Sequence, residues 1–233
     1  MKRLSGAMRN LPRDLRWWIA DYIYAGWWQV RGALGRSAES YLEGSLRPII
    51  VLPGIYESWY FMRPTIDRLH DAGHPVHVVS ELSRNRRPVD AAADLVAAFI
   101  AERNLRDVVI VAHSKGGLIG KYVMAKLDPD SRIPHMVAIS TPFSGSIYAQ
   151  WMLLPSLRSF SPKNALTLTL SKELTVNERI TSVFGLFDPH IPRGSELTGA
   201  DNRVVETGGH FRILDDERVI DIVTAIAARP GRD

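Results

Sequence analysis

Apolar residues along the chain follow two alternating patterns. Short uninterrupted runs, rich in valine and isoleucine, are typical of strands that are buried on both faces of a sheet. Longer segments place apolar residues three or four positions apart, which is typical of helices that cover such a sheet. We therefore predict strands at 48–52, 76–79, 108–111, 136–140, 180–186 and 203–206, and helices at 58–72, 89–104, 116–127 and 215–228.

The alternation of strands and helices predicts the class of fold. Parallel strands need long crossover connections, and helices usually supply them on both faces of the sheet. We expect an α/β fold with a mostly parallel central sheet, helices on both faces and at most a small lid. The chain divides into an N-terminal segment at 1–47 and a single domain at 48–233.

The strand predicted at 108–111 turns directly into a helix at Ser114. Small residues stand two positions on either side of this serine, Ala112 and Gly116, so that strand and helix can approach closely. Such a turn holds the serine hydroxyl above the sheet, and the new helix directs its N-terminal amides at an oxygen that becomes negative during acyl transfer. The pattern predicts a nucleophile elbow. The alternative is an ordinary Ser-Gly turn.

Two further polar residues follow predicted strands directly. Asp188 comes after the strand at 180–186, and His210 comes after the strand at 203–206. The carboxyl ends of parallel strands meet at one edge of the sheet, where functional residues gather. Serine is a poor nucleophile without a base, and a carboxylate holds that base in the right tautomer. We predict Ser114 as nucleophile, His210 as general base and Asp188 as its acid partner.

Other titratable residues compete for these roles. Asp201 is a weaker acid candidate because no strand precedes it directly. His190 stands two residues after Asp188, and it is either a rival for the base or a solvated loop residue. His113 adjoins the nucleophile, but its side chain should point away from Ser114, so we interpret it as a packing or hydrogen-bonding residue.

An acyl-transfer site also needs amide donors for the oxyanion. One should be the amide of Lys115, which follows the nucleophile. The second should come from the loop after the first strand, and we expect Ile55 to supply it, with Tyr56 as the alternative. The competing interpretation of this loop is an ordinary Pro53-Gly54 turn.

Four segments together resemble bacterial lipases and esterases of the α/β-hydrolase superfamily. They are the elbow at 111–117, Ser-Thr-Pro-Phe-Ser-Gly at 140–145, the acid loop at 187–192 and Gly-Gly-His at 208–210. The resemblance covers roughly residues 48–228.

The resemblance implies a catalytic domain at 48–233 that cleaves acyl or lipid esters through an acyl-serine. It implies the triad Ser114, Asp188 and His210, an oxyanion hole from Ile55 and Lys115, and no metal or organic cofactor. The chain departs from those lipases at Pro53, where histidine is usual, and at Lys115, where methionine or leucine is common and a long cation is expected near the cleft. An acyltransferase, a thioesterase and a non-catalytic membrane-associated protein with this fold are the alternatives.

The segment at 143–170 should form an acyl-binding wall or small lid, because it joins two strands at the active edge and is rich in apolar residues. We expect Phe143 and Trp151 from this segment, together with Tyr56, to bind substrate. The alternative is that the apolar residues fill core.

A loop with three arginines follows the strand at 76–79. Arg84, Arg86 and Arg87 could hold an anionic head group at the active edge, whereas charge runs more often only solvate a surface loop.

Residues 1–47 carry the positive excess of the chain. They hold eight Lys or Arg against four Asp or Glu, whereas the rest of the chain is balanced and the formal net charge is +4. A balanced body argues against a nucleic-acid-binding face, so we expect no nucleic-acid partner.

Residues 15–31 contain four of the six tryptophans, with arginines on either side. Tryptophan and tyrosine favour the membrane interface and arginine attracts anionic lipid, so one prediction is peripheral membrane contact through this segment. The alternative is a helix that packs its aromatic rings against the domain or a second subunit.

The composition gives no sign of an oxidising compartment or of a membrane span. The absence of cysteine excludes disulfides and thiolate metal sites. Arginines interrupt what would be the apolar core of a signal peptide, and the longest uncharged stretch, 133–157, is broken by three prolines. We expect a cytoplasmic protein whose membrane contact is at most peripheral.

Overall fold

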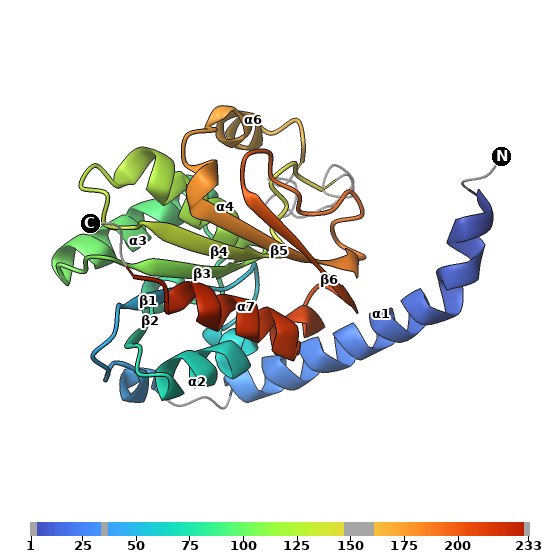
Figure 1. The fold of residues 1–233 in the computed structure, drawn as a ribbon, viewed down its shortest axis with the longest axis horizontal. Helices are drawn as coiled ribbons and strands as arrows, with labels where there is room; N and C mark the ends of the chain where they lie inside the picture. The colour runs from blue at the N-terminus through green and yellow to red at the C-terminus, as the bar shows by residue number, and fades with distance from the viewer. Residues whose placement is uncertain (1–3, 34–36, 147–160, 231–233) are drawn as a thin grey trace.

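A six-stranded parallel sheet forms the centre of the computed structural model, which describes residues 4–33, 37–146 and 161–230, with side chains from residue 12 onward. The strand order is β2-β1-β3-β4-β5-β6, and every neighbouring pair is parallel (Figure 1). This confirms the predicted fold class. The strands are β1 (Ile49–Leu52), β2 (Val76–Val78), β3 (Val109–His113), β4 (His135–Ile139), β5 (Ile180–Phe187) and β6 (Asp201–Gly208).

Helices cover both faces of the sheet, so that each face has its own hydrophobic core (Figure 1). In β1, Ile50 and Leu52 pack into one core, and Ile49 and Val51 pack into the other. This double burial explains the apolar runs of β1, β3 and β4, which are inner strands of the sheet. The helices of the described chain are α1 (Leu4–Ala33), α2 (Arg63–Asp71), α3 (Val89–Glu102), α4 (Lys115–Tyr122), α6 (Ala165–Lys172) and α7 (Glu217–Ala227).

Two predicted helices differ in detail. The helix expected at 58–72 is a 3₁₀ turn at Trp59–Met62 followed by α2, which begins where Pro64 can occupy its first turn. The helix expected at 116–127 begins at Lys115 and ends in one π-helical turn at Val123–Leu127.

The N-terminal helix α1 is 30 residues long and runs beside the end of β6 towards α2 (Figure 1). Its Trp17 ring stacks on Phe187 with the ring centroids 6.4 Å apart. The same ring lies so close to Gly208 that a Cβ there would meet it at 2.2 Å. Tyr24 donates a hydrogen bond to the carbonyl of Phe61 at 2.9 Å. One face of α1 therefore belongs to the packed structure.

Asp21 anchors the middle of α1 beside the sheet. Its carboxylate is fully buried and accepts hydrogen bonds from the amides of Phe211 and Arg212 at 2.7 and 2.8 Å. Gly209 has φ of +111°, and a Cβ there would lie 2.6 Å from the Asp21 carboxylate. The glycine pair before His210 thus makes room for α1, which the sequence pattern did not reveal.

No helix in residues 4–33, 37–146 and 161–230 has an apolar stretch long enough to cross a bilayer.

Candidate active site

Ser114 lies on the turn between β3 and α4, with φ of 50° and ψ of −118°. A residue with a side chain adopts this conformation only under strain, on the order of 1–3 kcal/mol, which the surrounding structure must hold. Gly116 makes the turn sterically feasible, because a Cβ there would lie 2.0 Å from the carbonyl oxygen of Leu52 on β1. The local geometry is that of a nucleophile elbow.

The structure brings Ser114, His210 and Asp188 together in one line of hydrogen bonds. His210 Nδ1 donates to Asp188 Oδ2 at 2.8 Å, and the Ser114 hydroxyl donates to His210 Nε2 at 3.0 Å. The other Asp188 oxygen accepts from the amides of His190 and Ile191 at 2.8 and 3.0 Å. The carboxylate thus fixes the imidazole tautomer whose free nitrogen faces the serine, as a general base requires.

The environment of this pair shifts both pKa values. Burial opposes the charged form of His210, but the Asp188 carboxylate outweighs it and raises the pKa of His210 above its ordinary value. Burial also opposes the charged form of Asp188 and would raise its pKa, but the charge and hydrogen bond of His210 hold that pKa below its usual range.

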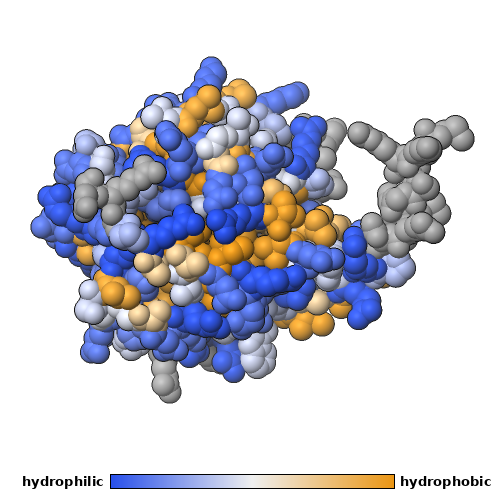
Figure 2. All heavy atoms as spheres, in the orientation of Figure 1, coloured by the Kyte–Doolittle hydropathy of each residue, from blue (hydrophilic) through white to orange (hydrophobic). Residues whose placement is uncertain are grey.

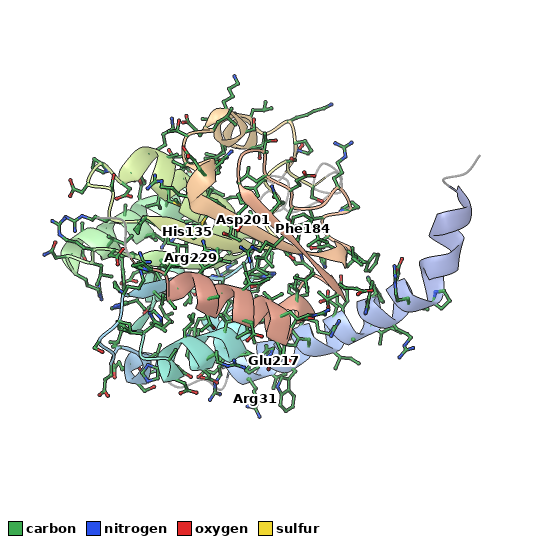
Figure 3. The ribbon with its side chains drawn as sticks, viewed as in Figure 1. Arg31, His135, Phe184, Asp201, Glu217 and Arg229 are labelled. Atoms are coloured by element: carbon green, nitrogen blue, oxygen red, sulfur yellow. The ribbon has the colours of Figure 1, made fainter. Side chains whose placement is uncertain are left out.

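Asp201 lies far from this line of hydrogen bonds. It is the first residue of β6 and lies near His135, the first residue of β4 (Figure 3). Phe184 marks the other direction, because it lies further along β5 towards the active edge (Figure 3). Its carboxylate pairs with Arg203 at 2.9 Å. Asp201 therefore lies at the amino edge of the sheet and cannot reach His210.

His190 is not a solvated loop residue, which was one of the two interpretations that the sequence left open. Its ring lies 4.7 Å from the His210 ring, centroid to centroid, and its Nε2 lies 3.2 Å from the Tyr22 hydroxyl of α1. Burial and the neighbouring His210 lower the pKa of His190 to about 4, so this ring is neutral near pH 7. The acid loop folds back onto the site, which places His190 beside the candidate base.

The loop after β1 lies against the elbow, as an oxyanion loop would. The amide of Tyr56 is engaged, because it donates to the carbonyl of Arg84 at 2.8 Å. The amide of Ile55 donates to no described residue, and Ile55 lines the cavity above Ser114. The amide of Lys115 is at the first position of α4, where no intrahelical acceptor exists. This geometry favours Ile55 over Tyr56 as the second donor.

A buried pair, Glu57 and His113, joins this loop to the candidate base. Glu57 Oε2 accepts from the amide of Gly54 at 2.8 Å and lies 2.8 Å from His113 Nδ1. His113 Nε2 donates to the carbonyl oxygen of His210 at 2.8 Å. His113 is thus a hydrogen-bonding residue, but nothing in the sequence pairs it with Glu57, 56 positions earlier.

The side chain of Lys115 does not point to the cleft, which corrects the expectation from the sequence. It is buried, and its ammonium donates to the carbonyl of Asn85 at 2.8 Å and to that of Arg87. Burial lowers the pKa of Lys115 to about 8. Asn85 in turn donates to the carbonyl of Pro53 at 2.7 Å, so Lys115 holds the loop that supports the oxyanion loop.

A cavity of about 650 Å³ opens above Ser114. Helix α1, which the sequence did not place at the site, forms one wall. The lining residues are Tyr22, Ala25, Gly26, Gln29, Ile55, Tyr56, Glu57, Phe61, Ser114, Pro142, Ser146, Pro189, His190, Ile191, His210 and Phe211.

Only part of the expected substrate set lines this cavity. Tyr56 lines the cavity. Phe143 packs in a hydrophobic core instead, and its neighbour Pro142 lines the cavity. Trp151 lies outside the described residues. The exposed side chains of the loop at 84–87 do not line the cavity, which agrees with the interpretation that its arginines are solvated on the surface. Within the described ranges, no three acidic or histidine side chains are grouped so as to hold a metal ion.

Comparisons with known proteins give two kinds of relative. No protein-family model matches the chain. Rat lysosomal thioesterase PPT2 is 27% identical over 128 residues, covering 50% of this chain and 42% of that protein. The human PPT2 is 26% identical, covering 49% of this chain and 41% of its own length. The matched stretch thus spans less than half of these curated relatives.

Solved structures match over more of the chain. The mature lipase BlEst2 of Bacillus licheniformis has a TM-score of 0.64 at 14% identity, covering 80% of this chain and 92% of that one. Aspergillus fumigatus lipase B has a TM-score of 0.65 at 16% identity, covering 84% of this chain and 56% of that one. At these identities the likeness concerns the fold. The chain has the α/β-hydrolase fold.

Proposed function

We propose that this protein is a serine hydrolase that cleaves carboxylic esters or thioesters of apolar acyl groups through an acyl intermediate on Ser114. The observation that carries the proposal is the line of hydrogen bonds from Ser114 through His210 to Asp188, at the floor of a cavity with largely apolar walls. A cavity of this kind accepts an acyl chain and excludes bulk water from the reacting carbonyl.

The reaction follows from the positions of these groups. Ser114 Oγ attacks the acyl carbonyl while its proton passes to His210 Nε2. The amides of Ile55 and Lys115 donate to the oxyanion of the tetrahedral intermediate. The intermediate collapses, the bond to the leaving group breaks, and His210 returns its proton to the departing alkoxide or thiolate. Water then attacks the acyl-serine by the same route and releases the acid.

Oxygen esters and thioesters are both candidates for the substrate. The lipases among the solved structures support an oxygen ester, whereas the PPT2 relatives, named as thioesterases, support a thioester. An acyltransferase would use the same acyl-serine with an alcohol in place of water.

Labelling with a fluorophosphonate tests the nucleophile directly. The wild-type protein should be labelled, Ser114→Ala should not, and Ser146→Ala should still be labelled, because Ser146 lines the cavity but bonds to the carbonyl of His190. Hydrolysis of p-nitrophenyl esters and acyl-coenzyme A thioesters of rising chain length then identifies the bond that is cleaved. Labelling that persists in Ser114→Ala refutes the proposal.

A further inference from the structure

One face of α1 is packed and the opposite face is exposed and apolar. The packed face contains Asp21 and the partly buried Trp17 and Trp28. The opposite side, here called the outer face, consists of six side chains that are 44% to 68% exposed: Leu15, Trp18, Ile19, Ile23, Trp27 and Val30.

Soluble proteins rarely expose contiguous apolar surface of this kind unless something covers it. Figure 2 shows hydrophobic side chains along α1 and a further hydrophobic area over the ends of β5 and β6. Two tryptophans on the outer face favour the interface between water and hydrocarbon, where a large ring can be buried while its N–H remains hydrated.

The charges around the outer face identify its partner. Arg13 and Arg16 lie near one end and Arg31 lies at the other, and all three are exposed. Among the described side chains of α1, Asp14 pairs with Arg13 at 3.3 Å and Asp21 is buried, so no acidic side chain of this helix offsets Arg16 or Arg31. A helix with an apolar face and basic ends matches an anionic lipid surface.

The cavity adjoins the outer face. Tyr22 and Gly26 are exposed on α1 and also line the cavity. A Cβ at Gly26 would meet no atom within 4 Å, so this edge of the helix leaves open space beside the cavity. A bilayer that covers the outer face would therefore lie next to the cavity.

We propose that the outer face of α1 docks on an anionic phospholipid bilayer, which brings the cavity to acyl substrates that reside in the membrane. The benefit to substrate access rests on the proposed function, whereas the docking itself does not. Asp21 and Trp17 hold α1 to the body through its packed face, so docking needs no release of the helix.

Vesicle binding by the full-length protein tests the proposal. The test variant is Ile19→Ser/Ile23→Ser/Val30→Ser, whose side chains do not line the cavity. The matched control is Leu42→Ser/Leu46→Ser/Leu174→Ser, three leucines of similar exposure, 48% to 58%, away from α1. Vesicles of phosphatidylcholine with and without phosphatidylglycerol serve as probes.

Wild type and control should sediment with the phosphatidylglycerol vesicles more strongly than with the neutral ones, and added salt should weaken this binding. The test variant should lose on the order of 100-fold in partitioning, because three apolar side chains no longer enter the interface. All three proteins should hydrolyse a soluble short-chain ester equally.

Equal vesicle binding by the test variant and the wild type overturns the proposal, as does wild-type protein that binds no vesicles. A wild-type dimer that the test variant converts to monomer also overturns it, because the outer face would then be a subunit interface. Ser114→Ala separates the two proposals: it should bind vesicles without hydrolysing esters. Vesicle binding without any ester or thioester hydrolysis by the wild type would refute the proposed function alone.

Discussion

The floor of the cavity and its α1 wall are held in place by different kinds of contact. The floor consists of residues at strand ends, where short buried hydrogen bonds join Ser114, His210 and Asp188. The wall is a single helix that presents Tyr22, Ala25 and Gly26 and is held by aromatic packing and by hydrogen bonds from its side chains. Small shifts in the floor should therefore alter the chemical step, whereas changes in the wall should alter which acyl groups fit.

Hydrogen bonds join the wall to both sides of the site. Asp21 holds the loop after His210, and Gln29 donates to the carbonyl of Tyr56 in the oxyanion loop at 3.2 Å. Helix α1 thus supports the loops around Ser114, His210 and Asp188 but supplies no group to the proposed reaction. Variants that separate these two contributions make the comparison testable.

The largest effect in this series should come from Asp188→Asn in the floor. The amide leaves the geometry similar but favours the wrong imidazole tautomer, so kcat should fall by about 10⁴-fold. Asp201→Asn is the matched control, because that carboxylate is at the opposite edge of the sheet, and it should leave kcat unchanged. The reverse result would move the acid role to Asp201.

The pH dependence of kcat/KM follows from the same pair. His210 acts as a base only when neutral, and its pKa is raised, so kcat/KM should fall as pH drops through that raised pKa. Asp188→Asn removes the carboxylate that raises the pKa, so the acidic limb should move to lower pH. Protonation of His190, whose pKa is about 4, adds a like charge beside His210 only at still lower pH. An acidic limb that stays in place in Asp188→Asn would contradict this account.

A smaller effect is expected where the floor is held indirectly, at His113. Asparagine at this position cannot reach both Glu57 and the His210 carbonyl, so the base and the oxyanion loop should lose their common support. A misplacement of this kind should lower kcat on the order of 10- to 100-fold with little change in KM.

His135→Asn is the control for His113→Asn. It removes a histidine that lies 3.0 Å from the Thr181 hydroxyl at the amino edge of the sheet. Steady-state kinetics and urea unfolding of both variants separate positioning from stability. Equal losses of kcat in the two variants would show that His113 acts only through stability.

The smallest effects should come from Gly26 in the wall. Phenylalanine there would fill open space beside the cavity and should lower the ratio of long-chain to short-chain ester turnover roughly tenfold. Gly26→Ala should raise the free energy of unfolding by about 0.5–1 kcal/mol, because glycine inside a helix is unfavourable. An unchanged chain-length preference in Gly26→Phe would show that acyl chains do not pass this edge.

Much of the fold and the central serine could be predicted because the signals are local. Continuous apolar runs indicated β1, β3 and β4, since these inner strands are buried on both faces. Ser114 could be placed because Gly116, two residues later, must lie against Leu52 for the turn to form. Asp188 and His210 could be predicted as its partners because each comes after a strand, and the carboxyl ends of parallel strands lie at one edge of the sheet.

Features that depend on contacts between distant parts of the chain were decided by the tertiary structure alone. The glycines at 208 and 209 are visible in the sequence, but the side chains that require them, Trp17 and Asp21, lie about 190 residues earlier. The Glu57–His113 pair and the burial of the Lys115 ammonium are equally non-local. Local patterns determine which segments form strands, helices and turns, whereas the direction of a buried polar side chain depends on the partner that packing brings to it.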